Sequence, residues 1–233
     1  MKLHLAVAFV ASVLSLGAPL LADAPPRAEH VAVPGDRAAS VVRGPLGAKD
    51  VLVYLPGKCG DPDAPIKAFS REAAGRATLV VVQGDVACPD RPGRTRWSAS
   101  PARAHERIEA ALRAASRGGE SLPTARRTII GYSEGALRAE SVAKRFPDVY
   151  PRVALLASPR AAAGTSFQRS QRVAVGVGTR DAQKTTRDTV DNLHRAGVPT
   201  RLFLFPGAKH GQYGDAGGRV MSQVFDWLEG TGG

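Results

Sequence analysis

The chain has 233 residues, of which 43% are hydrophobic and 23% are charged, and its formal net charge is +11. This composition excludes a disordered protein, and the length suits a single α/β domain with a sizeable core. The positive charge comes mainly from scattered arginines without interleaved aromatic residues, which argues against a nucleic-acid-binding platform.

The N-terminus has the pattern of a secretory signal peptide. Lys2 precedes an apolar run from Leu3 to Leu21, and Ala22-Asp23-Ala24 offers small residues at a cleavage site. We therefore expect residues 1–24 to be removed and the mature protein to be secreted or periplasmic. An uncleaved membrane anchor is the alternative, because the run approaches the length that spans a bilayer. The proline-rich, polar residues 25–38 are interpreted as a lead-in segment.

A single domain is expected over residues 39–230, with a flexible Gly-rich tail at 231–233. We find neither an internal repeat nor a linker that would divide it. The domain opens with two predicted strands at 40–43 and 50–55. The turn Gly44-Pro45-Leu46-Gly47 between them predicts a β-hairpin.

Beyond residue 50, apolar strands and amphipathic helices mostly alternate. This alternation is typical of an α/β protein with a mostly parallel, twisted sheet and helices on both faces. The spacing of apolar residues predicts helices at 64–74, 102–116, 134–146, 183–194 and 218–228, and strands at 78–83, 127–132, 152–157, 172–178 and 201–205.

Two cysteines, Cys59 and Cys88, are present. A pair in an exported protein favours a disulfide, and two free thiols are the alternative. The bond would close a loop of roughly 30 residues and stabilise the fold by about 3 to 4 kcal/mol on the chain-entropy argument. Nothing near either cysteine has the spacing of metal ligands, so no metal site is predicted.

One motif indicates the chemistry of the chain. GYSEG at 131–135 has the Gly-x-Ser-x-Gly pattern and lies between a predicted buried strand and a predicted helix. That context is typical of a nucleophile elbow, in which small residues let the chain turn sharply and expose the serine. Without the context the pattern arises often by chance. Ser133 is therefore the candidate nucleophile.

A nucleophilic serine needs a base and an acid that orients the base. In a parallel sheet these groups come from loops at the carboxyl ends of strands. Of the five histidines, His210 alone follows a predicted strand in such a loop, and Asp181 follows the strand before it. The alternatives are a surface histidine without a role and an aspartate that caps the helix at 183–194. The order Ser133, Asp181, His210 is that of α/β-hydrolases.

The oxyanion that forms when a serine attacks a carbonyl needs backbone donors. The N–H of Glu134 directly follows the nucleophile, at the start of the predicted helix. The second predicted donor is the N–H of Lys58, in the loop after the strand at 50–55, and an ordinary Pro-Gly turn is the alternative reading of that loop. A bond between Cys59 and Cys88 would make this loop stiffer.

Over residues 38–230 the chain resembles the α/β-hydrolase fold, and most closely its small dienelactone hydrolase and phospholipase/carboxylesterase families. The resemblance rests on GYSEG at 131–135, GTRD at 178–181 and PGAKHG at 206–211. It implies hydrolysis of esters or thioesters through an acyl-enzyme, without a cofactor. Relatives often have His-Gly where this chain has Pro56-Gly57, which leaves the subfamily open. GYSEG is also similar to the GYSQG of cutinases, whose acid and histidine lie closer together in sequence.

Only residues 158–171 separate two predicted strands, so we expect no large cap domain and a fairly open site for small or chain-like acyl esters. Trp97 and Tyr213 are candidates to line the pocket, with core packing favoured for Trp97. Two other functions stay open: a serine peptidase-like amide hydrolase, and a non-catalytic envelope protein whose arginines bind anionic polymers. The basic surface either gives weak attraction to anionic envelope surfaces or keeps the protein soluble. Nothing indicates an oligomeric state.

Overall fold

The computed structural model describes residues 26–48, 50–116, 122 and 127–231. The predicted signal peptide at 1–24 and residues 232–233 of the predicted tail lie outside them. Within the described ranges, no helix combines the length and the apolar character that crossing a membrane requires.

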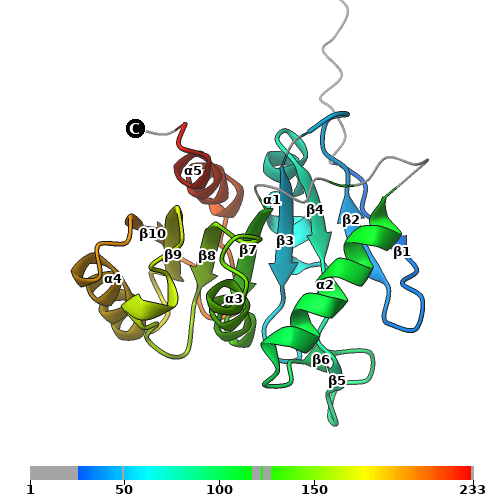
Figure 1. Ribbon diagram of the computed structural model, residues 1–233, viewed down its shortest axis with the longest axis horizontal. Coiled ribbons are helices and arrows are strands. Elements are labelled where there is room, and N and C mark those ends of the chain that lie inside the picture. Colours follow the sequence, from blue (N-terminus) through cyan, green and yellow to red (C-terminus); the bar gives the residue numbers. More distant parts are fainter. Residues whose placement is uncertain (1–25, 49, 117–121, 123–126, 232–233) are drawn as a thin grey trace, which may run out of the picture.

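An eight-stranded sheet forms the centre of the molecule, with the strand order β1-β2-β4-β3-β7-β8-β9-β10 (Figure 1). Pairing is antiparallel from β1 to β2 and from β2 to β4, and parallel between all the following neighbours. The strands are β1 (Glu29–Val31), β2 (Ala39–Val42), β3 (Val51–Leu55), β4 (Thr78–Val81), β7 (Arg127–Tyr132), β8 (Arg152–Leu156), β9 (Arg172–Gly178) and β10 (Thr200–Phe205). A separate antiparallel pair is formed by β5 (Val86–Ala87) and β6 (Thr95–Arg96).

Helices cover both faces of the sheet, as the sequence predicts. One face packs against α1 (Ala64–Ala74) and α5 (Gly217–Glu229) through a core that includes Phe69 and Phe225. The other packs against α2 (Pro101–Ala115), α3 (Glu134–Arg145) and α4 (Lys184–Arg195). In Figure 1, α2 and α3 lie in front of the strands and α1 lies behind them. Because both faces are covered, the central strands are buried along their whole length.

The predicted hairpin between residues 40–43 and 50–55 is wrong. β4 lies between these two strands and pairs with both of them, Val80 opposite Val41 on one side and Val53 on the other. Gly44 leads the chain past the start of β4: a Cβ on this glycine would lie 2.3 Å from the carbonyl carbon of Ala77. The Gly-Pro turn therefore begins a crossover to the far side of β4.

The other predicted helices and strands are observed within two residues of their expected ends. The structure adds β1, which lies inside the segment interpreted as a lead-in and extends the sheet by one strand. Between β8 and β9 the helical structure is the short 3₁₀ turn Gly164–Ser166. The expectation of no large cap domain is therefore confirmed for this connection.

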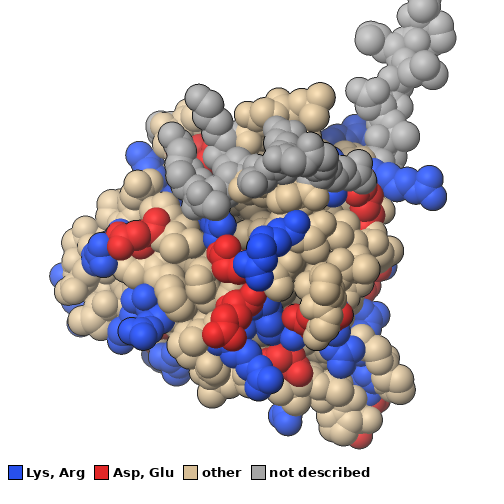
Figure 2. Space-filling model, turned by 45° about the vertical axis from the view of Figure 1, so that its right-hand side comes forward, with Lys and Arg blue, Asp and Glu red and all other residues tan. Residues whose placement is uncertain are grey.

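Charged side chains of both signs share the surface. On the face shown in Figure 2, Asp and Glu side chains lie among the Lys and Arg side chains. Several arginines of the described residues are paired with carboxylates, for example Arg107 with Asp36 at 2.5 Å and Arg43 with Glu29 at 3.2 Å. On this face the excess of arginine does not form a continuous patch of one sign.

A partly buried histidine on α2 makes the stability of the fold sensitive to pH. The ring of His105 stacks on Phe146 with centroids 4.0 Å apart, and its Nδ1 lies 2.9 Å from the Tyr150 hydroxyl oxygen. Burial lowers the pKa of His105 below its ordinary 6.5, and nearby Glu109 opposes this effect while Arg127 adds to it. The folded state therefore favours the neutral imidazole.

The unfolded chain binds a proton at His105 more readily than the folded chain does, so acid favours unfolding. We expect the contribution of His105 to stability to be constant above pH 6.5, the ordinary pKa, and to be lost as the pH falls from there through the lower folded pKa. Urea unfolding across this range should show a smaller pH dependence in His105→Gln than in the wild type. The exposed His194 provides the control variant, His194→Gln. Equal slopes in wild type and His105→Gln would contradict the expectation.

Candidate active site

The GYSEG segment forms a sharp turn between β7 and α3. Ser133 stands at this turn with φ 53° and ψ −118°, a conformation that residues with a Cβ seldom adopt. Its N–H donates to the carbonyl oxygen of Leu156 on β8 at 2.8 Å, which fixes the turn to the carboxyl end of the sheet. A strained serine between a strand and a helix is the geometry of a nucleophile elbow.

Both glycines of the motif are required by close backbone contacts. A Cβ on Gly131 would lie 2.2 Å from the carbonyl oxygen of Gly135. A Cβ on Gly135 would lie 2.0 Å from the carbonyl oxygen of Leu55, at the end of β3. Since backbone oxygens cannot rotate away, the elbow passes its neighbours this closely only without side chains at these positions.

The three side chains that the sequence selected for catalysis lie in one chain of contacts. His210 Nε2 is 3.1 Å from Ser133 Oγ, and His210 Nδ1 is 2.8 Å from Asp181 Oδ2. The Asp181 side chain is mostly buried, with 13% exposure, whereas the His210 side chain is 52% exposed. An imidazole held between a hydroxyl and a carboxylate can take a proton from the hydroxyl while the carboxylate stabilises its charged form.

The loops that carry Asp181 and His210 are joined to each other by backbone contacts. The N–H of Arg180 donates to the carbonyl oxygen of Ala208 at 3.0 Å, and the N–H of Gly207 donates to Thr179 Oγ1 at 2.9 Å. Asp181 is not the N-cap of α4, which is Gln183. The second oxygen of Asp181 accepts a hydrogen bond from the N–H of Ala182 at 2.7 Å, so both carboxylate oxygens have partners.

Tyr132 belongs to this arrangement although the sequence reasoning did not select it. Its hydroxyl accepts a hydrogen bond of 2.7 Å from the N–H of Gly211, the residue after His210. Its ring lies 5.7 Å from the imidazole of His210 and 5.7 Å from the ring of Tyr213. An aromatic residue with a hydroxyl next to the nucleophile was the signal that could have identified it. Tyr132 thus links the nucleophile turn to the histidine loop.

The two backbone donors predicted for an oxyanion lie on segments that meet at Ser133. Glu134 is the first residue of α3, where N–H groups have no acceptor within the helix. On the opposing segment, a Cβ on Gly57 would lie 3.1 Å from Ser133 Cβ, so the loop that carries Lys58 passes directly beside the nucleophile. Lys58 and Ser133 both line the same cavity.

The predicted disulfide between Cys59 and Cys88 is confirmed, with 5.9 Å between the two Cα atoms. The N–H of Cys59 also donates to the carbonyl oxygen of Thr95 on β6 at 2.8 Å. The loop after β3 is therefore attached covalently to Cys88, the residue that follows β5, and by a hydrogen bond to β6.

Trp97 lies in the core, the role that the sequence favoured. It is 6% exposed and is not among the described residues that line the cavity. Its indole N–H donates to the carbonyl oxygen of Pro56 at 2.9 Å, and its backbone N–H donates to Glu134 Oε2 at 2.9 Å. Trp97 therefore holds the loop after β3 and the start of α3 together.

A cavity of about 500 Å³ opens beside Ser133 and His210, and Tyr213 lies in its wall. Its charged lining residues are Lys58, Asp61, Arg91 and Arg94. Arg94 contacts Asp61 at 2.7 Å. The hydrogen bond from Arg94, with another from Lys67, lowers the pKa of Asp61 to about 2, so this carboxylate stays ionised at neutral pH.

Comparison with known proteins identifies the fold. No protein-family model and no curated protein sequence matches the chain. Among solved structures, esterase PE8 is 18% identical with a TM-score of 0.62, over 81% of this chain and 97% of that one. FphF, a fluorophosphonate-binding serine hydrolase of Staphylococcus aureus, is 15% identical with a TM-score of 0.60, over 87% and 96%. An S-formylglutathione hydrolase from Agrobacterium tumefaciens is 14% identical with a TM-score of 0.61, over 89% and 94%.

At these sequence identities the likeness shows the fold and not the activity. The mostly parallel sheet with helices on both faces matches that of these hydrolases over almost their whole length. The chain therefore has the α/β-hydrolase fold, which confirms the fold that the sequence predicted.

Proposed function

We propose that this protein is an exported serine hydrolase that cleaves carboxylic esters or thioesters through Ser133, His210 and Asp181. The observation that carries the proposal is the continuous contact from Asp181 Oδ2 to His210 Nδ1, at 2.8 Å, and from His210 Nε2 to Ser133 Oγ, at 3.1 Å. The structural neighbours described as esterases and as serine hydrolases support the same reaction class.

In the proposed first half of the reaction, Ser133 Oγ attacks the ester carbonyl carbon while its proton moves to His210 Nε2. The carbonyl oxygen becomes negative and accepts hydrogen bonds from the N–H groups of Lys58 and Glu134. The bond to the leaving oxygen or sulfur then breaks, and the proton on His210 passes to it. An acyl group remains on Ser133, and Asp181 has stabilised the imidazolium throughout.

In the second half, water takes the place of the departed alcohol or thiol. His210 removes a proton from the water as its oxygen attacks the acyl carbon, and the same two backbone donors stabilise the oxyanion. The bond from the acyl carbon to Ser133 Oγ breaks, and His210 returns the proton to Ser133. The carboxylic acid is released and the enzyme is restored.

The proposed compartment is the secreted or periplasmic side of the membrane. The disulfide between Cys59 and Cys88 supports it, because such bonds persist in oxidising compartments. N-terminal sequencing of the exported protein would test the expected removal of residues 1–24.

A substrate panel tests the reaction class. We expect turnover of short p-nitrophenyl esters and no turnover of matched aminoacyl and prolyl p-nitroanilides. Faster turnover of the amides would identify a peptidase-like enzyme instead. Salt-sensitive retention on heparin without hydrolysis of either series would indicate a non-catalytic protein that binds anionic polymers.

Removal of the Tyr132 hydroxyl should loosen the loop that carries His210 without removing any group that takes part in the proposed reaction. Tyr132→Phe keeps the ring that packs against His210 and deletes the acceptor for the N–H of Gly211. We expect kcat to fall roughly threefold to tenfold, the equivalent of one hydrogen bond, with little change in KM.

The measurement is steady-state kinetics on p-nitrophenyl butanoate, alongside thermal unfolding of the same samples. A purely structural role for Tyr132 would lower the unfolding temperature and leave kcat unchanged below it, and that outcome would refute the positioning role.

A further inference from the structure

Two buried tyrosines form a hydrogen-bonded pair in the cavity wall. Tyr54 on β3 is 3% exposed and Tyr213, in the loop after His210, is 7% exposed. Their hydroxyl oxygens are 2.6 Å apart, and both residues line the cavity that contains Ser133. The pair joins the strand before the Lys58 loop to the loop of the proposed catalytic base.

The number of protons in this pair leaves one of them without an acceptor among the described residues. Each hydroxyl carries one proton, and only one proton can lie in the hydrogen bond between the two oxygens. Among the hydrogen bonds of the described residues, neither hydroxyl has a second acceptor. Because a buried donor without an acceptor is costly and both residues line the cavity, the second proton can be donated to an acceptor atom that enters the cavity.

Burial keeps both groups in the form that can donate. It raises the pKa of Tyr54 and of Tyr213 above the ordinary value, so both hydroxyls stay protonated at neutral pH. The ring of Phe69 packs against both tyrosines, with centroids 6.1 Å from Tyr54 and 5.3 Å from Tyr213. This contact holds the hydroxyls in place, so the donor is preorganised.

The rest of the cavity wall is poor in aliphatic side chains. Among the described residues that line it, Ala64 carries the only aliphatic side chain. The rim carries cationic Lys58 and Arg91. An acyl chain would contact tyrosine rings and polar groups here rather than aliphatic side chains, and a short acyl group with an oxygen atom would also find a donor.

We propose that the hydroxyl pair of Tyr54 and Tyr213 is a hydrogen-bond-donating subsite for an acceptor oxygen on the acyl part of the substrate. The inference rests on the proposed ester hydrolysis. It narrows the expected substrates from small or chain-like acyl esters to esters of short, oxygenated acids. An ether, keto, hydroxyl or carboxylate oxygen supplies the acceptor.

Matched ester pairs test the subsite. p-Nitrophenyl methoxyacetate is compared with the butanoate, and the 3-methoxypropanoate with the pentanoate, so that one oxygen replaces one methylene in a chain of equal length. The ratio of kcat/KM within each pair is measured for wild type and for Tyr54→Phe/Tyr213→Phe. Comparing these ratios between proteins cancels the intrinsic reactivity of each ester.

We expect the double variant to lose roughly threefold to tenfold of the preference for the oxygenated ester in at least one pair. Each single variant keeps one hydroxyl and its proton, and should lose less. The double variant is expected to fold, because replacing both partners of a hydrogen bond with apolar groups of the same shape is nearly neutral. Ratios that equal those of the wild type in both pairs would overturn the subsite.

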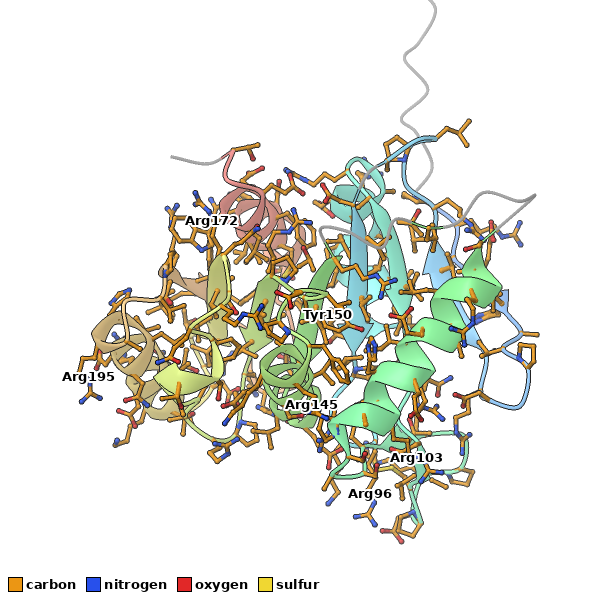
Figure 3. The ribbon with its side chains drawn as sticks, viewed as in Figure 1. Arg96, Arg103, Arg145, Tyr150, Arg172 and Arg195 are labelled. Atoms are coloured by element: carbon orange, nitrogen blue, oxygen red, sulfur yellow. A yellow bond between two sulfur atoms is a disulfide. The ribbon has the colours of Figure 1, made fainter. Side chains whose placement is uncertain are left out.

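Tyr150→Phe is the matched control. Tyr150 is also a buried tyrosine with a hydrogen-bonded hydroxyl, but it belongs to the core on the opposite face of the sheet. Figure 3 shows Tyr150 between α2 and α3, which cover that face, and shows Arg172 beside α5, which covers the other face. Its ratios should equal those of the wild type.

Labelling of the wild type with a fluorophosphonate separates the two proposals. Labelling at Ser133 and hydrolysis of both esters, with unchanged ratios in the double variant, would overturn the subsite alone. A wild type that is neither labelled nor active would overturn the proposed function together with the subsite that rests on it.

Discussion

Ser133→Ala is expected to abolish ester hydrolysis and fluorophosphonate labelling while the protein stays folded. Oγ is the atom that would form the acyl-enzyme, and loss of the nucleophile of a serine triad lowers kcat by a factor on the order of 10⁶. Alanine keeps the Cβ of serine, so the turn at φ 53° is neither relieved nor strained further. The hydroxyl has His210 as its partner at 3.1 Å, on the exposed side of the site, so little stability is lost with it.

The measurement combines labelling, mass spectrometry of the labelled peptide, and thermal unfolding. Ser133→Gly serves as the matched variant, because glycine adopts positive φ without the cost that a Cβ carries. It should be as inactive as Ser133→Ala and more stable by about 1 kcal/mol. Labelling that persists in both variants at another residue would refute the assignment of the nucleophile.

Gly135→Ala is expected to damage both the fold and the site. The added Cβ would lie 2.0 Å from the carbonyl oxygen of Leu55 and 2.6 Å from that of Pro56. Backbone atoms cannot move aside by a rotamer change, so either α3 must shift away from β3 or the loop that carries Lys58 must move. We expect a destabilisation of about 2 to 4 kcal/mol from this overpacking. We also expect a loss in kcat of about 10²-fold, because the proposed oxyanion donors no longer meet at one point.

A second Gly→Ala substitution provides the control for helix propensity and for the presence of the methyl group. Gly75 ends α1 with φ −69°, and a Cβ there would lie 3.7 Å from its nearest atom, an ordinary contact. Gly75→Ala should therefore change the free energy of unfolding by less than about 0.5 kcal/mol and leave kcat unchanged. If Gly135→Ala behaves like Gly75→Ala in urea unfolding and in kinetics, the close approach of α3 to β3 is not required.

The sequence alone was sufficient for the local elements and for the order of the site residues. Val51–Leu55 and the part of Arg172–Gly178 that follows Arg172 are continuous, buried apolar runs. The helices between the strands have one apolar face, so the alternation predicted a parallel sheet. In such a sheet every strand ends at the same edge. That rule selected Asp181 and His210 as residues expected near Ser133 before any distance was known.

Strand partners and side-chain neighbours were decided only by the tertiary structure. β2 and β3 are buried on both faces, so their patterns do not say which neighbour each prefers, and β4 separates them where the turn predicted a hairpin. In the sequence, Tyr54 is indistinguishable from the other core residues of the strand VLVYL. Its contact with Tyr213 joins residues that are 159 positions apart. Periodicity reports which face of an element is buried, whereas contacts between distant segments depend on how those faces pack together.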